Sequence, residues 1–168
     1  MPFSVSLSFM KIALKIREEM GDDWMPVIYQ KKIRPLRTRS VELDVPKREN
    51  FPSILITLLG VELKIGRKRF ACPNIETARY LLCFTRAGCR KVAVPYDITK
   101  IGPMADLLEN AWGKMDALIA RYAADFTPQT RGRLRSRLTK EIREDIEKIG
   151  AGELMPLFDK QTKQRKTA

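Results

Sequence analysis

The chain has no histidine, and this absence limits the chemistry that its side chains could perform. Without an imidazole there is no serine–histidine or cysteine–histidine nucleophile pair and no zinc site that uses histidine. A reaction would have to use carboxylates, lysine, tyrosine or a magnesium ion held by carboxylates. The spacings of Cys72, Cys83 and Cys89 match neither a disulfide framework nor a zinc ligand pair, so we expect small buried thiols and no resident cofactor.

One set of charged residues has an order that could hold a metal ion. Asp44 ends a predicted strand, and Glu62 and Lys64 lie two residues apart inside a later predicted strand, which a helix and a further strand follow. This order resembles the PD-(D/E)XK nuclease family, in which an acid on one strand and an acid-x-lysine on the next hold a metal ion and activate water. The resemblance implies that Asp44 and Glu62 would hold Mg²⁺ and that Lys64 would orient the nucleophile. The alternation of a strand places Glu62 and Lys64 on the same face, as a shared site requires.

The same residues also fit a strand without catalytic function. No Pro-Asp pair precedes the acid of the first strand, and the match covers three residues. Val61, Leu63 and Ile65 alternate with the two charged residues, which is the pattern of any half-buried surface strand. A magnesium-dependent nuclease is therefore kept as an alternative to a binding function without catalysis.

The formal net charge of +12 is the largest departure from an ordinary composition. A charge of this size acts on partners and association rates rather than on the fold, and it favours a polyanion. Nucleic acid, an anionic membrane surface and an acidic protein are the candidates. The basic residues recur in runs: the segment 31–39 contains five of them and no acid, and four surround a predicted turn at Gly66.

The predicted helix Thr127–Ile149 carries its charges in the order that opposes the helix dipole. Arginines crowd its N-terminal half and acids its C-terminal half, an order that forfeits about 0.3 to 1 kcal/mol for each charge in a terminal turn. Stability alone would not select this order. A row of basic residues lies opposite the apolar stripe and is expected to face solvent. Arginine can bind a phosphate through two parallel hydrogen bonds, so this row suits a phosphate ligand. The alternative is the solvated face of a basic protein.

We therefore expect a protein that contacts the phosphates of DNA or RNA through a basic helix face. No motif distinguishes DNA from RNA or a duplex from a single strand. A third class is a non-catalytic interaction or assembly module whose helical hairpin docks on an acidic protein partner. The predicted nucleic-acid contacts are Arg133, Arg137, Lys140 and Arg143, supported by Arg131, Arg135, Lys68 and Arg69.

The elements that would position these residues indicate an α/β domain, with an α+β arrangement as a variant. The periodicity predicts an N-terminal helix from Leu7 to Met20, a helix from Asn74 to Gly88, and two helices, the first starting at Gly102, that pack as an antiparallel hairpin. Strand, helix and strand in succession predict one crossover unit on a small mixed sheet. Strands are expected at 27–33, 40–45, 53–65, 69–72 and 90–96.

The length of 168 residues suits one globular domain, which we place at residues 1–158. Residues 159–168 are basic and almost without apolar side chains, so we expect a disordered tail. The longest apolar stretch, residues 54–59, is too short to span a membrane, and basic residues interrupt what would have to be a signal-peptide core. These features together predict a cytoplasmic protein.

Overall fold

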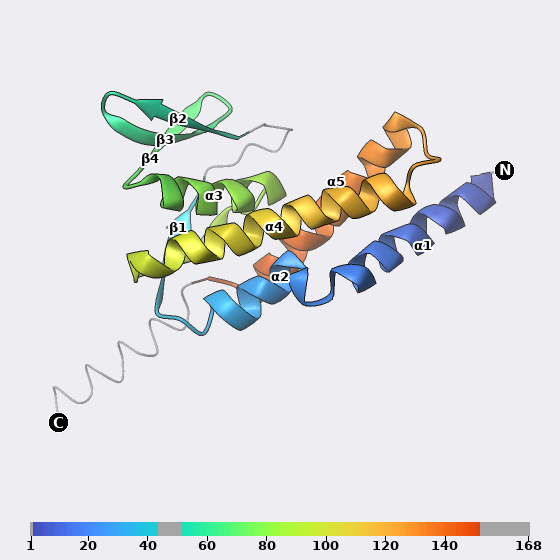
Figure 1. The fold of residues 1–168 in the computed structure, drawn as a ribbon, viewed down its shortest axis with the longest axis horizontal. Coiled ribbons are helices and arrows are strands. Elements are labelled where there is room, and N and C mark those ends of the chain that lie inside the picture. Colours follow the sequence, from blue (N-terminus) through green and yellow to red (C-terminus); the bar gives the residue numbers. More distant parts are fainter. Residues whose placement is uncertain (1, 44–51, 152–168) are drawn as a thin grey trace.

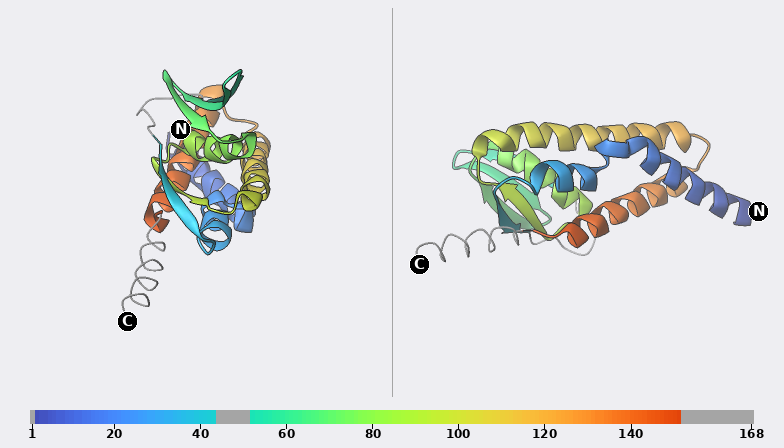
Figure 2. Two further views of the ribbon diagram at one scale, coloured as in Figure 1. Left: turned by 90° about the vertical axis from the view of Figure 1, so that its left-hand side faces the viewer. Right: turned by 90° about the horizontal axis from the view of Figure 1, so that it is seen from below.

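The computed structural model of the protein describes residues 2–43 and 52–151, which form helices and two small antiparallel sheets (Figures 1 and 2). The combination of helices and strands that we predicted is confirmed. Asp44 and the predicted tail at 159–168 lie outside the described residues. No helix in the described segments is long and apolar enough to cross a membrane.

The chain begins with helical segments only. These are α1 (Pro2–Met20), the single turn η1 (Gly21–Asp23), α2 (Met25–Ile28) and the π-helical turn η2 (Tyr29–Ile33). The strand predicted at 27–33 is therefore wrong. Met25, Ile28, Tyr29 and Ile33 are buried, at the spacing of one helix face, while residues 30–32 are exposed. The β-branched composition of this segment suggested a strand, but the helical period of its apolar residues determines the structure.

Five strands follow in two separate antiparallel sheets. In the first sheet, β1 (Thr38–Glu42) pairs with β5 (Lys91–Pro95). The second sheet has the order β2-β3-β4, with β2 (Ser53–Thr57), β3 (Gly60–Ile65) and β4 (Lys68–Cys72). The predicted strand 53–65 is thus a hairpin that turns at Leu58 and Leu59.

A well-capped helix, α3 (Ile75–Ala87), connects the two sheets. The side chain of Asn74 accepts a hydrogen bond from the backbone N–H of Thr77 at 2.8 Å, and Gly88 ends the helix with a φ of 82°. Both predicted caps are confirmed. Because β4 and β5 belong to different sheets, the expected crossover unit and the single mixed sheet do not form.

The predicted antiparallel helical hairpin is confirmed. It consists of α4 (Ile98–Tyr122) and α5 (Pro128–Ile149), which run in opposite directions along the length of the molecule (Figures 1 and 2). α4 begins at Ile98, four residues before the predicted start at Gly102, because Asp97 caps it: its side chain accepts a hydrogen bond from the N–H of Thr99. Trp112 is buried, and its Nε1 donates to the carbonyl oxygen of Cys83. Trp112 is therefore part of the core.

Candidate nucleic-acid interface

The helix α5 turns one apolar stripe toward the core and a basic face away from it. Thr127 caps its N-terminus by accepting a hydrogen bond from the N–H of Thr130, and Pro128 occupies the first helical position. The buried residues are Leu134, Leu138, Ile142 and Ile146, which fix the rotation of the helix about its axis. This rotation decides which of the predicted basic residues reach solvent.

Three of the four principal residues that we predicted are exposed: Arg133, Arg137 and Lys140. Arg133 forms no ion pair within the described part of the chain. Arg137 and Lys140 each have a carboxylate four residues further along the helix, with N···O distances of 3.8 Å to Glu141 and 3.9 Å to Glu144. Exposed pairs of this length contribute only a few tenths of a kcal/mol, so both cations can exchange these carboxylates for a phosphate.

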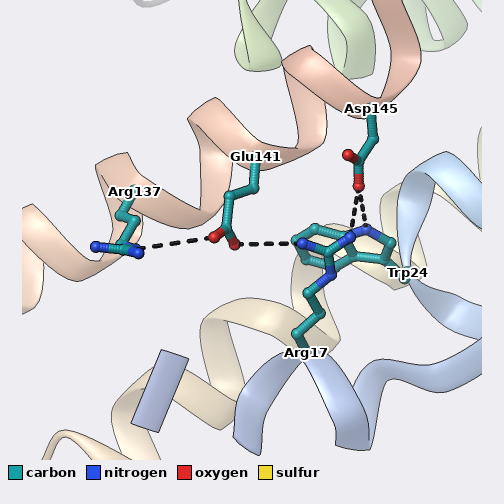
Figure 3. A network of polar contacts seen from close by, with 5 residues as sticks. All are labelled: Arg17, Trp24, Arg137, Glu141 and Asp145. Carbon is teal, nitrogen blue, oxygen red and sulfur yellow. Dashed lines mark hydrogen bonds and ion pairs between the residues drawn. The ribbon is translucent and has the colours of Figure 1, made fainter. Parts of the chain in front are cut away.

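Two acidic residues of α5, Glu141 and Asp145, face α1 and bind Arg17 (Figure 3). The guanidinium of Arg17 donates to Asp145 at 2.7 Å and lies 3.8 Å from Glu141. Trp24 also donates to Asp145 through Nε1 at 3.3 Å, and the Arg17 guanidinium lies over the Trp24 ring. These carboxylates bind α1 and the turn that follows it to the C-terminal half of α5.

These contacts supply part of the reason for the charge order of α5. Glu141 and Asp145 lie in the C-terminal half because that half meets Arg17. Of the supporting arginines in the N-terminal half, Arg135 pairs with Asp116 of α4 at 3.0 Å. Tertiary ion pairs therefore offset some of the dipole cost, and Arg131 and Arg133 are the basic residues of this half that form no ion pair within the described residues.

Arg143, the fourth principal residue, is half-buried and lies against the C-terminus of α3. A methyl group built on Gly88 would lie 2.9 Å from Nη1 of Arg143, so the guanidinium rests directly on the glycine. A cation at this position also balances the negative end of the α3 dipole. Arg143 therefore has a structural role in addition to any contact with a ligand.

Two exposed arginines that we did not select, Arg86 and Arg90, flank Gly88. They lie in the last turn of α3 and directly before β5, close to the contact between Gly88 and Arg143. In the sequence these residues are two arginines on either side of a helix-ending glycine. This pattern alone does not indicate a binding surface, because Arg143 reaches the same glycine only through the packing of α5.

The supporting residues Lys68 and Arg69 begin β4, directly after the turn at Gly66. The sheet packs on α3, and α3 runs back beneath it from the end of β4 (Figure 1). The structure therefore places Lys68 and Arg69 on the sheet that covers α3. We call the basic side chains along α5, around the end of α3 and at the start of β4 the basic strip; it comprises the half-buried Arg143 and the exposed Arg133, Arg137, Lys140, Arg86, Arg90, Lys68 and Arg69.

The residues of the nuclease-like pattern are not assembled into one site by the described structure. Glu62 and Lys64 share one face of β3, as predicted, but Arg69 in the neighbouring strand lies 3.6 Å from Oε2 of Glu62. β1, the strand that precedes Asp44, belongs to the other sheet. Within residues 2–43 and 52–151 no three acidic or cysteine side chains gather as metal ligands would. Because Asp44 lies outside the described residues, the nuclease alternative stays a prediction.

The basic run at 31–39 is not a continuous exposed surface. Arg34 is buried, Lys31 lies 3.5 Å from Asp22, and the guanidinium of Arg37 lies over the ring of Tyr96. Tyr80 cannot stack on bases because its side chain is fully buried beside Phe84. The predicted burial of all three cysteines is confirmed.

No known family, no curated protein and no solved structure matches this chain. The function must therefore be inferred from the residues and their geometry.

Proposed function

We propose that the protein binds nucleic acid through its phosphates and that the basic strip is the contact surface. One observation carries the proposal: α5 holds Arg133 and Lys140 exposed on the side opposite its buried stripe, in a chain with a net charge of +12. Residues 133 and 140 lie about 10 Å apart along the helix axis. At this spacing the two side chains can contact separate phosphates of one backbone.

The form of the strip favours contact with the backbone rather than with bases. Its side chains are cations, which recognise phosphate, and the buried Tyr80 cannot serve as a stacking platform. We therefore expect binding that depends strongly on salt and weakly on sequence.

The test is fluorescence anisotropy of labelled duplex DNA, single-stranded DNA and RNA over a series of salt concentrations. The double variant Arg133→Ala/Lys140→Ala should weaken binding to every sequence alike and lower the slope of log K against log salt by about two. The matched control is Lys32→Ala/Lys100→Ala, which removes the same charge from exposed positions in η2 and in the first turn of α4. The control should retain the wild-type slope.

Equal losses in the two double variants would show that net charge, not the basic strip, drives binding. An absence of binding to all three probes at low salt would overturn the proposal. An acidic protein partner would then be the better explanation of the strip.

A further inference from the structure

The outer edge of β2 combines exposed apolar side chains with a complete absence of charge. No acidic or basic residue occurs from Pro52 to Val61. Within the described residues β3 is the only strand that pairs with β2, so the opposite edge of β2 has no strand beside it. Ile56 is 76% exposed, and Leu58 and Leu59 at the turn are almost completely exposed. Proteins usually protect such an edge with lysine, proline or a covering segment.

The chain covers the comparable edge of its other sheet. On the side of β5 away from β1, the N–H of Ala93 donates to the hydroxyl of Tyr29 at 3.0 Å. The carbonyl oxygen of Ala93 accepts a hydrogen bond from the hydroxyl of Tyr80, and both tyrosines are buried. One sheet edge is thus closed by side chains, whereas no strand among residues 2–43 and 52–151 pairs with the outer edge of β2.

The register of the hairpin shows which peptide groups these are. Thr57 and Gly60 flank a two-residue turn, and the residues that close such a turn bond each other through their backbones. Because the direction of the peptide groups alternates along a strand, those of Ser53, Leu55 and Thr57 point to β3. The N–H and C=O groups of Ile54 and Ile56 therefore point outward.

The sequence of β2 is symmetric about Leu55: a hydroxyl residue, isoleucine, leucine, isoleucine and a hydroxyl residue. We propose that β2 pairs antiparallel with β2 of a second copy, with the two-fold axis at Leu55. In this register Ile54 faces Ile56 of the other copy, and their outward peptide groups exchange hydrogen bonds on both sides of the axis. Ser53 faces Thr57, and Leu55 faces its own copy. The pairing continues the sheet across both chains.

Neither the charges of the β2 segment nor the spacing of the two α3 helices opposes this pairing. Two chains of net charge +12 repel each other, but the uncharged segment from Pro52 to Val61 brings no like charges face to face. The two β3 strands would lie three strand spacings apart, about 14 Å. This separation exceeds the 8–10 Å between packed helices, so the α3 helices beneath the two sheets fit side by side.

The first test is sedimentation equilibrium at high protein concentration in about 1 M salt, where charges are screened beyond about 3 Å and bound nucleic acid is released. We expect a concentration-dependent dimer of twice 19.3 kDa. Ile56→Lys should give a monomer with an unchanged melting temperature, because the side chain is exposed and lysine protects an edge. The control Ile98→Lys changes an equally apolar side chain, 68% exposed at the start of α4, and should remain dimeric. A wild-type monomer, or a dimer that survives Ile56→Lys, would overturn the proposal.

The second test measures the register by oxidative crosslinking. Leu55→Cys places two thiols opposite each other at the axis, where the Cα atoms are about 4.5 Å apart, within reach of a disulfide. Leu58→Cys is more exposed, but in this register its two copies lie about 20 Å apart. We expect covalent dimers from Leu55→Cys at least tenfold faster than from Leu58→Cys. Equal rates would indicate random collision and refute the pairing. Because neither test contains nucleic acid, a failure here leaves the proposed binding function unaffected.

Discussion

The guanidinium of Arg143 in α5 rests on Gly88, the residue that ends α3. Gly88 has a φ of 82°, and the side chain of Arg143 occupies the space where any Cβ would lie. This contact joins the basic face of α5 to the C-terminus of α3. Arg133, by contrast, is exposed and makes no comparable contact within the described residues.

The two arginines should therefore respond differently to removal. Arg143→Ala should lower the free energy of unfolding by about 1 kcal/mol, because the cation at the negative end of α3 and its packing are lost. Arg133→Ala should leave stability within about 0.5 kcal/mol of wild type, as for other exposed positions, and weaken only nucleic-acid binding. Urea denaturation and anisotropy on the same samples measure both quantities. Equal stability of the two variants would contradict a structural role for Arg143.

Substitution of the glycine, Gly88→Ala, tests the contact between Gly88 and Arg143 independently. An alanine in the left-handed region costs about 1–2 kcal/mol, and its methyl group would displace the Arg143 side chain. Urea denaturation should show a loss in this range. In an Arg143→Ala background the loss should be smaller, because the displaced group is absent. A loss that is the same in both backgrounds would assign the whole effect to the backbone of Gly88.

Local signals in the sequence predicted the helix ends well. Asn74 and Gly88 bound α3, and Thr127 with Pro128 starts α5, because caps depend on residues within one turn of each other. The hairpin within 53–65 was missed because Leu58 and Leu59 are not turn-forming residues. The side chain of Thr57 compensates by accepting from the N–H of Leu59 and donating to the carbonyl oxygen of Gly60. This use of a threonine is not evident from the alternation of apolar residues.

The candidate site was predictable only in part. Helical periodicity placed Arg133 and Lys140 on the exposed face, since that face depends only on the position of the apolar stripe. The partner of Asp145 could not be foreseen, because Arg17 lies 128 residues away in the sequence. For the same reason the sequence does not reveal the tertiary ion pairs, Arg17 with Asp145 and Arg135 with Asp116, that explain some of the charge order of α5.

The Arg17–Asp145 pair should couple α1 to α5 measurably. We expect Arg17→Ala and Asp145→Ala each to destabilise the protein, and their combination to cost less than the sum by about 0.5–1 kcal/mol, because the pair is part-buried and directly hydrogen bonded. A double-mutant cycle in urea measures the coupling. Trp24 fluorescence should shift in the Asp145 variant, since Nε1 of Trp24 loses its acceptor. Strict additivity would mean that the pair contributes nothing.

Tyr29→Phe should destabilise the protein although it removes a single oxygen atom. The Tyr29 hydroxyl accepts from the N–H of Ala93 and donates to the carbonyl oxygen of Gly150 at 2.8 Å, so it links β5 to the end of α5. Its removal leaves the buried N–H of Ala93 without a partner, at a cost of about 1–3 kcal/mol. Thermal and urea unfolding measure the loss. Tyr96→Phe is the control at an exposed tyrosine and should have no effect.

Stability should decline at alkaline pH because of the buried thiols of Cys83 and Cys89. Burial raises the pKa of Cys83 and of Cys89 to about 12, from an ordinary value of 9.0; Glu147 adds to the shift of Cys89, and Arg143 opposes it. The folded protein holds these protons more tightly than the unfolded chain does. The stability that they contribute is therefore complete below pH 9 and is lost as the pH rises from 9 toward 12.

The free energy of unfolding should consequently be flat from about pH 7 to 8 and then fall by up to about 1.4 kcal/mol per pH unit for each thiol. Urea titrations up to about pH 9.5 leave most tyrosine side chains of the unfolded chain protonated, because their ordinary pKa is about 10. The variant Cys83→Ala/Cys89→Ala removes both groups, so its stability should decline much less over this interval, whatever its value at neutral pH. An identical decline in this variant would show that the buried thiols do not cause it and that other groups titrate on unfolding.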